Sequence, residues 1–202
     1  MNLFFDLDGT LIDSRLRLYQ LFQHLVKCSE LDFDQYWELK RNKINHKKIL
    51  TSRFNYSDEE YIDFENKWMA EIELKKWLDL DVSFDGVHGL LAKLSENNSI
   101  YVVTARHNSE NTLRQLKSFK WKTFIKSILI TEQKHSKIEL IKNNVLVKSE
   151  DWFIGDTGKD IETGKKLEIN TAAVLSGFLN KKCLIEYNPD IIIENVTKFE
   201  LI

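Results

Sequence analysis

Short apolar segments with strand character alternate with helical segments along most of this chain, beginning at its first residues. Alternation of this kind, with short connections, favours a parallel sheet with helices on both faces. We therefore predict an α/β fold with a Rossmann-like sheet. The expected strands cover residues 2–5, 99–104, 127–131, 151–155, 171–175 and 191–193, and the expected helices cover residues 108–119, 136–142 and 159–167. In the first of these helices, Leu113, Leu116 and Phe119 are expected to face the sheet.

Residues 15–80 break this alternation directly after the first strand. Their first part carries apolar side chains at helical spacing, namely Leu16, Leu18, Leu21, Phe22, Leu25 and Val26. Ser57 opens a capping box that predicts a helical run as far as Trp77. We interpret the block as an α-helical cap inserted into a core domain made of residues 1–14 and 81–202.

The composition limits the class of protein. With 202 residues, of which 43% are hydrophobic, the chain can bury a sizeable core. The 29 basic and 31 acidic residues leave a net charge of -2, which favours neither a nucleic-acid polymer nor a membrane surface as a partner. No window approaches the roughly 18 apolar residues of a spanning helix. Cys28 and Cys183 lie far apart and outside any metal-type spacing, which fits reduced thiols. With no spanning window, we expect a cytoplasmic protein.

Two aspartates follow the first expected strand. Asp6 and Asp8 stand two residues apart, so an extended backbone places both carboxylates on one side. Gly9 allows a sharp turn beside them, and the Thr10 hydroxyl can tie that turn. Asp and Gly are also common in turns without any function. The placement of Asp-x-Asp-Gly-Thr directly after a buried strand nevertheless favours a reactive site.

A second pair of carboxylates follows a later strand. Asp156 and Asp160 lie in Gly-Asp-Thr-Gly-Lys-Asp, between the strand at 151–155 and the next helix. Ligands of open parallel sheets bind at the carboxyl ends of the strands, so this pair should approach the first. Two unit charges about 4 Å apart repel by roughly 4 kcal/mol at an effective dielectric near 20. A cluster of this kind requires a cation, and oxygen ligands point to Mg²⁺.

Thr104 and one of two lysines complete the candidate site. The Thr104 hydroxyl, at the end of its strand before Ala105, can hold a phosphate oxygen. We prefer Lys137 to Lys134, because Ser136 and Glu139 form a capping box that makes Lys137 the first residue of a helix. That position fixes the stem of Lys137 at the carboxyl edge of the sheet.

Other chemically capable side chains are interpreted as outside the site. The histidines are scattered without metal-ligand spacing, and the tryptophans suit packing. A further set of cationic residues could line the cap cleft, but we favour a solvated helix face for them: Arg15, Arg17, Lys47 and Arg53.

Taken in order, these motifs resemble the haloacid dehalogenase superfamily in its phosphatase branch, and 155–178 is similar to the phosphoglycolate phosphatase-like group. The resemblance covers the whole chain and implies a helical cap of the first type. It also implies an Mg²⁺-dependent phosphatase in which Asp6 forms an aspartyl-phosphate and Asp8 acts as general acid and base.

The same resemblance implies the roles of the remaining residues. Mg²⁺ would be held by the Asp6 carboxylate, the Asp8 backbone carbonyl and Asp156, with Asp160 supporting. Thr104, Ala105 and Lys137 would bind the phosphate of a small phosphorylated substrate. The family's lysine precedes two apolar helix positions, which Leu140 and Ile141 match.

Several alternatives remain open at this stage. Asp8 argues against the dehalogenase branch, which lacks an aspartate there and uses no metal. A phosphosugar mutase of the same fold would keep the phosphate, and no motif separates it from a phosphatase. A non-catalytic binding module is disfavoured by the intact aspartates, and a receiver domain by the helical insertion. The substrate, the cap residues that select it and the oligomeric state are not specified.

Overall fold

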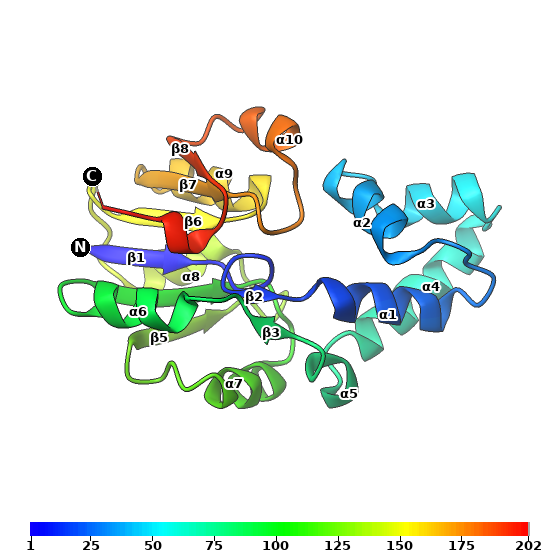
Figure 1. The fold of residues 1–202 in the computed structure, drawn as a ribbon, viewed down its shortest axis with the longest axis horizontal. Coiled ribbons are helices and arrows are strands. Elements are labelled where there is room, and N and C mark those ends of the chain that lie inside the picture. Colours follow the sequence, from blue (N-terminus) through cyan, green and yellow to red (C-terminus); the bar gives the residue numbers. More distant parts are fainter. Residues whose placement is uncertain (202) are drawn as a thin grey trace.

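The computed structural model describes residues 1–201 and contains a six-stranded sheet in which every neighbouring pair of strands is parallel. The strand order is β5-β4-β1-β6-β7-β8, so the first strand lies in the middle of the sheet (Figure 1). The predicted α/β fold is confirmed. The strands are β1 (Asn2–Phe5), β4 (Ser99–Thr104), β5 (Ile125–Ile130), β6 (Trp152–Gly155), β7 (Asn170–Val174) and β8 (Ile191–Ile193).

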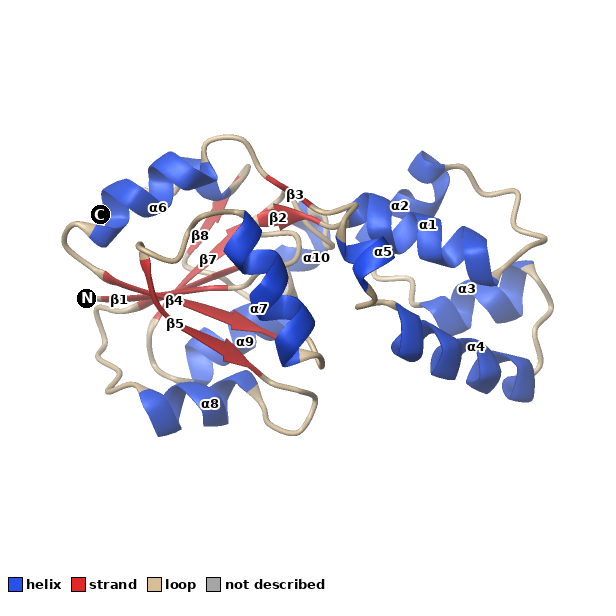
Figure 2. Ribbon diagram, turned by 90° about the horizontal axis from the view of Figure 1, so that it is seen from below, coloured by secondary structure: helices blue, strands red, loops and turns tan. Residues whose placement is uncertain are grey.

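Helices cover both faces of the sheet because successive side chains of β1 are apolar on both sides. Leu3 and Phe5 belong to a core shared with α6 (Val87–Ser95) and α7 (Ser109–Ser118), whereas Phe4 packs on the opposite face. That second face is covered by α8 (Lys137–Asn144) and α9 (Gly158–Lys166). Figure 2 shows α6 and α8 on opposite sides of the sheet. The chain continues with α10 (Lys181–Ile185) and a short 3₁₀ turn at Val196–Lys198.

A group of helices lies beyond one end of the sheet, and we call them the cap helices (Figure 1). They have an apolar core of their own, built around Leu21, Phe22 and Tyr36. The cap helices are α1 (Arg15–Leu25), α2 (Phe33–Arg41), α3 (His46–Arg53), α4 (Asp58–Glu71) and α5 (Lys75–Leu78).

The helical run predicted from Ser57 to Trp77 is confirmed as far as Glu71 and is wrong as one continuous helix beyond that residue. The Ser57 capping box is present, but α4 ends at Glu71 and a separate turn of helix, α5, follows. The reason is tertiary, because Glu73 leaves the helix and turns its carboxylate to the sheet domain, where it accepts hydrogen bonds from backbone N–H groups.

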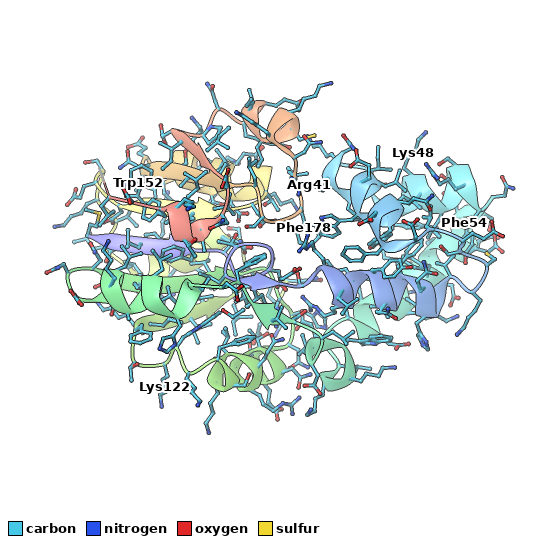
Figure 3. The ribbon with its side chains drawn as sticks, viewed as in Figure 1. Arg41, Lys48, Phe54, Lys122, Trp152 and Phe178 are labelled. Atoms are coloured by element: carbon cyan, nitrogen blue, oxygen red, sulfur yellow. The ribbon has the colours of Figure 1, made fainter. Side chains whose placement is uncertain are left out.

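Two connections join the cap helices to the sheet. They pair as short antiparallel strands, β2 (Ile12–Asp13) and β3 (Val82–Ser83), which the sequence pattern did not predict. A further contact comes from α2, where Arg41 donates to the Leu175 carbonyl at 3.2 Å. Figure 3 shows Arg41 and Phe178 between the two parts of the molecule.

The apolar face of α7 is narrower than predicted. Leu113, expected to face the sheet, is 48% exposed, while Leu116 is buried. Within residues 1–201, none of the helices combines the length and the apolar character that crossing a membrane requires.

Candidate active site

The central strands β4, β1 and β6 end side by side, and each end delivers polar side chains to the same edge. Asp6 directly follows β1, and its backbone N–H donates to the Ile154 carbonyl of β6 at 2.9 Å. Thr104 ends β4, and Asp156 directly follows β6. The sheet order therefore brings together three motifs that lie up to 150 residues apart in the sequence.

Three carboxylates form the centre of the candidate site. One oxygen from each of Asp6, Asp156 and Asp160 lies within 4.8 Å of the others, and all three residues are buried. Burial raises the pKa of Asp6 to about 7, against the opposing effect of Lys137. Burial and the charges of Asp6 and Asp160 raise the pKa of Asp156 well above its ordinary value. A cluster of oxygen ligands that resists ionisation without a counter-charge fits a hard cation such as Mg²⁺.

The Asp156 carboxylate is enclosed by backbone. Phe178 N–H donates to its Oδ2 at 2.6 Å, and the Thr10 hydroxyl donates to Oδ1 at 3.3 Å. Gly9 has a φ of +86°, and a Cβ there would come within 2.4 Å of Asp156 Oδ2. At Gly177 the same distance would be 2.0 Å. Both loops therefore need glycine to let the backbone approach this carboxylate.

Lys137 lies inside the cluster, and Lys134 does not. The Nζ of Lys137 donates to Asp6 Oδ1 at 2.5 Å and to Asp160 Oδ1 at 2.6 Å. The capping box at Ser136 is present and starts α8 at Lys137, so the stem begins from a fixed turn. Lys134 pairs with Glu132 on the surface, with 71% of its side chain exposed.

Asp160 is oriented from two sides. Its Oδ2 accepts hydrogen bonds from the Thr157 N–H at 3.0 Å and from the Thr157 hydroxyl at 2.6 Å, within the capping box of α9. Its Oδ1 is the one bound by Lys137. This arrangement lets Asp160 hold the lysine and stand next to a cation, as a supporting residue would.

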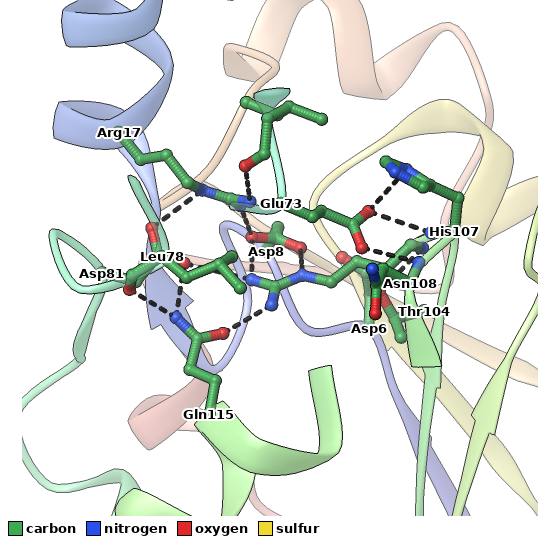
Figure 4. Close-up of polar contacts among 12 residues, drawn as sticks. Asp6, Asp8, Arg17, Glu73, Leu78, Asp81, Thr104, His107, Asn108 and Gln115 are labelled. Atoms are coloured by element: carbon green, nitrogen blue, oxygen red, sulfur yellow. Dashed lines mark hydrogen bonds and ion pairs between the residues drawn. The ribbon is translucent and has the colours of Figure 1, made fainter. Parts of the chain in front are cut away.

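Asp8 is held by two arginines (Figure 4). Arg106 forms a fork, with Nε at 2.8 Å from Asp8 Oδ2 and Nη2 at 2.8 Å from Oδ1, and Arg17 also contacts Oδ1. Burial alone would raise the pKa of Asp8, but the two guanidinium groups outweigh it and hold the pKa below its ordinary value. Asp8 is therefore an oriented carboxylate beside Asp6.

The expectation that Arg17 lies on a solvated helix face is wrong. Arg17 is 3% exposed, and its Nε lies 3.0 Å from the buried Asp81 Oδ1. Arg106 also contacts Asp81, at 3.1 Å. Burial raises the pKa of Asp81 to about 6 in spite of the arginines. These charges come from α1, from the connection beside β3 and from the loop after β4, so only docking of the cap helices reveals the network.

A second buried carboxylate links the cap helices to the loop that follows Thr104. Glu73 accepts from the backbone N–H groups of His107 and Asn108 at 2.9 and 2.8 Å, and it lies 3.0 Å from His107 Nδ1. His107, interpreted as a bystander from the sequence, thus helps to seat the cap helices. Sequence reasoning missed Glu73, Asp81 and Arg106; only Arg106 carried a signal, since it follows a strand end by two residues.

A cleft of about 560 Å³ opens above these groups, between the cap helices and the sheet. Thr104 is buried at its floor and Ala105 is exposed beside it, and both line the cleft. The predicted site residues Asp6, Asp8, Lys137 and Asp160 also line it, while the buried Asp156 lies behind them.

Gln133 reaches the cleft from a strained loop. Glu132 and Gln133 have φ of +50° and +55°, a conformation that costs a non-glycine residue ~1–2 kcal/mol. Glu132 N–H donates to the Arg106 carbonyl at 3.0 Å, and the Ser109 hydroxyl donates to the Glu132 carboxylate at 2.5 Å. These contacts hold the strained turn and direct Gln133 to the cleft.

Comparison with known proteins identifies the fold and the family. The model of the haloacid dehalogenase-like hydrolase family matches residues 3–174. The chain is 27% identical to pyrophosphatase PpaX of Oceanobacillus iheyensis over 204 residues, which cover 96% of this chain and 92% of the relative. PpaX of Listeria monocytogenes is 26% identical over 203 residues, with 97% and 93% covered.

Solved structures agree in fold. A haloacid dehalogenase-like hydrolase of Streptococcus pneumoniae superposes with a TM-score of 0.79 at 21% identity, covering 96% of this chain and 94% of that one. The magnesium-bound hydrolase YfnB of Bacillus subtilis, for which interdomain movement is described, superposes with a TM-score of 0.63 at 18% identity over the same shares of the two chains. The match to the family model spans most of the sequence, and the resemblance inferred from the motifs is confirmed: the chain belongs to the haloacid dehalogenase-like hydrolases.

Proposed function

We propose that this protein is an Mg²⁺-dependent phosphatase that hydrolyses a small phosphomonoester through an aspartyl-phosphate on Asp6. The observation that carries the proposal is the contact of Lys137 with both Asp6 and Asp160 beside the buried Asp156, with Asp8 two residues from the nucleophile. The curated relatives named pyrophosphatase support hydrolysis of a phosphorylated compound.

In the first step an Asp6 carboxylate oxygen attacks phosphorus, and the bond from phosphorus to the leaving oxygen breaks. Asp8 donates a proton to that oxygen, so the product leaves as a neutral hydroxyl. In the second step a water oxygen attacks the aspartyl-phosphate while Asp8 takes its proton. The bond between phosphorus and Asp6 breaks, phosphate leaves and both carboxylates return to their starting forms.

The residues around Asp6 support the transfer of the phosphoryl group by the places of their charges and hydrogen-bonding groups. Lys137 places a positive charge next to the attacking oxygen, and the Thr104 hydroxyl and the Ala105 backbone border the space that the phosphate would fill. Arg106 and Arg17 hold Asp8 in its ionised form, the form that accepts a proton from water. For the first step Asp8 must take up a proton from solvent, against the effect of these two guanidinium groups on its pKa.

Mg²⁺ would be held by the carboxylates of Asp6 and Asp156 together with the backbone carbonyl of Asp8, and Asp160 would support it. When bound, the ion would neutralise charge between the anionic nucleophile and the anionic phosphate. The fit rests on the three buried oxygens within 4.8 Å and on the raised pKa of Asp156. The magnesium-bound YfnB structure supports the choice of ion.

The proposed division into domains places residues 15–80 in a mobile cap and residues 1–14 and 81–202 in the core. The separate apolar core of the cap helices and the two paired connections, β2 and β3, support a hinge at that point. Hydrogen exchange with and without orthovanadate should show protection near both connections when the cap closes. Identical exchange in the two states would contradict a closing cap.

The central test is a phosphate-release screen over small phosphomonoesters, inorganic pyrophosphate and sugar phosphates, each with Mg²⁺ and with a chelator. We expect Mg²⁺-dependent release of free phosphate from at least one of them. Conversion of a sugar phosphate to its isomer without release of phosphate would instead support the mutase alternative. Full activity after exhaustive chelation would contradict the metal-dependent mechanism.

A further inference from the structure

The two sides of the cleft differ in chemistry. The side opposite the carboxylate cluster is formed by the cap helices, and its members are Arg17, Leu18, Trp68, Met69, Ile72 and Glu73. Its apolar members come from α1 and from α4 with the residue that follows it. A substrate whose phosphate lies on Asp6 must present its leaving group to this side.

Neither charged residue on the cap side is free to bind an anionic leaving group. Arg17 is occupied by Asp8, by Asp81 and by the Ile72 carbonyl. Glu73 is occupied by the N–H groups of the loop after Thr104. Among residues 1–201, the cleft-lining cation that makes no ion pair is Lys159, an exposed residue of α9 on the sheet side. A second phosphate placed against the cap side would lose water without gaining an unpaired cation from the cap helices, which is unfavourable.

Trp68 offers a rigid apolar surface to the leaving group. Its ring packs against His46, with ring centroids 4.3 Å apart, and against Phe64 at 5.7 Å. Trp68 and Met69 are each half-buried on the cleft side of α4. Because its orientation is fixed before any ligand binds, the indole can contact an apolar group at a small entropic cost.

Gln133 is the polar group that faces this apolar surface across the cleft. Its Nε2 lies 4.0 Å from the Met69 sulfur, a contact too weak to occupy the amide. The strained turn at Glu132 and Gln133 sets the direction in which the exposed side chain leaves the backbone. The amide can therefore bind a hydroxyl, carbonyl or amide of a leaving group that lies against Trp68.

We propose that the substrate is an organic phosphomonoester, with an apolar face on its leaving group against Trp68 and Met69 and a hydrogen-bonding group against Gln133, and that inorganic pyrophosphate is a poor substrate. The inference rests on the proposed phosphatase function and separates this chain from the activity in the names of its relatives. Trp68 and Gln133 are specificity-determining residues in this account.

The test compares inorganic pyrophosphate, phenyl phosphate and the three hydroxymethyl-substituted phenyl phosphates as substrates with Mg²⁺. We expect kcat/KM for phenyl phosphate to exceed that for pyrophosphate at least about tenfold, and the best substituted compound to exceed both. Equal or faster hydrolysis of pyrophosphate would overturn the inference and leave the phosphatase function standing. No phosphate release from any compound would overturn both.

Variants at Trp68 test the apolar surface directly. Trp68→Gln should lower kcat/KM for phenyl phosphate about tenfold and leave the slow pyrophosphate reaction within about twofold. Trp68→Leu keeps an apolar surface and should recover most of the loss, with circular dichroism confirming that both variants fold. The matched control is Trp77→Gln, because Trp77 is also half-buried in the cap helices but lies outside the cleft lining. A parallel loss on both substrates at Trp68 would contradict its role in selection.

Gln133→Leu tests the polar contact. The variant should reduce kcat/KM for the best hydroxymethyl compound to the level of phenyl phosphate, and leave phenyl phosphate itself unchanged. His135→Leu, on the exposed part of the same loop, is the matched control. Retained preference for the substituted compound in Gln133→Leu would show that the amide does not contact the leaving group.

Discussion

Replacing Asp6 with asparagine should abolish activity and at the same time stabilise the metal-free protein. Asparagine is nearly isosteric but cannot attack phosphorus. It also removes one negative charge from a buried cluster in which, among residues 1–201, only Lys137 provides a compensating charge. Lys137 keeps Asp160 as a partner at 2.6 Å in the variant, so the lysine is not left unpaired.

The size of the stabilisation follows from the pKa of Asp6. Burial raises this pKa from 3.8 to about 7, so the folded protein binds the proton more tightly than the unfolded chain does. The contribution of Asp6 to stability is therefore greatest at low pH and falls as the pH rises from about 4 to about 7. Relative to low pH, the raised pKa of Asp6 lowers the free energy of unfolding by about 4 kcal/mol at pH 8 and by about 2 kcal/mol at pH 5. Asp6→Asn does not lose this free energy, because an amide does not ionise.

The assay is urea unfolding of the parent and of Asp6→Asn in a chelating buffer at pH 5 and pH 8, alongside phosphate release with Mg²⁺. We expect Asp6→Asn to have the larger free energy of unfolding at pH 8, with a smaller difference at pH 5. Mg²⁺ should stabilise the parent much more than the variant. The exposed Asp85→Asn serves as the control and should match the parent throughout.

Two results would refute this reasoning. Activity of Asp6→Asn within tenfold of the parent would remove the nucleophile assignment. The opposite result would be a variant less stable than the parent at pH 8 without metal. It would show that the ion pair of Asp6 with Lys137 stabilises the fold by more than burial and the acidic neighbours of Asp6 destabilise it. The two readouts are independent, so either part can fail alone.

Three further predictions follow from the same structure. Lys137→Ala should lose at least about a hundredfold in kcat, and Lys134→Ala less than twofold, in parallel phosphate-release assays; the reverse order would place the phosphate-binding lysine on the loop. Asp156→Ala should shift the Mg²⁺ titration of activity to much higher concentration or end activity, and a normal titration curve would move the metal ligand elsewhere. Burial and Lys40 hold the pKa of His46 well below 6.5, so the contribution of His46 to stability should fall as the pH drops below about 6.5, where only the unfolded chain gains the proton. His46→Asn should flatten that decline in urea unfolding at pH 5 and pH 7, and an unchanged slope would contradict the assignment.

The sequence by itself determined the class of fold and the order of the motifs. Apolar runs of strand length alternating with helices specify a parallel sheet, because each such run must be buried on both faces. Capping boxes fixed where helices begin, since Ser57 and Ser136 satisfy free backbone N–H groups through local contacts. The start of α8 at Lys137 was therefore predictable, and with it the place of that lysine at the edge of the sheet.

Only the tertiary structure decided which charges meet. Arg17 lies in a helix whose sequence is equally compatible with a solvated face, and its burial against Asp8 and Asp81 depends on how the cap helices dock. Glu73 ends a predicted helix early because its carboxylate satisfies backbone N–H groups about 35 residues further along the chain. Periodicity and capping report contacts within a few residues, whereas these pairs form between segments that the fold alone brings together.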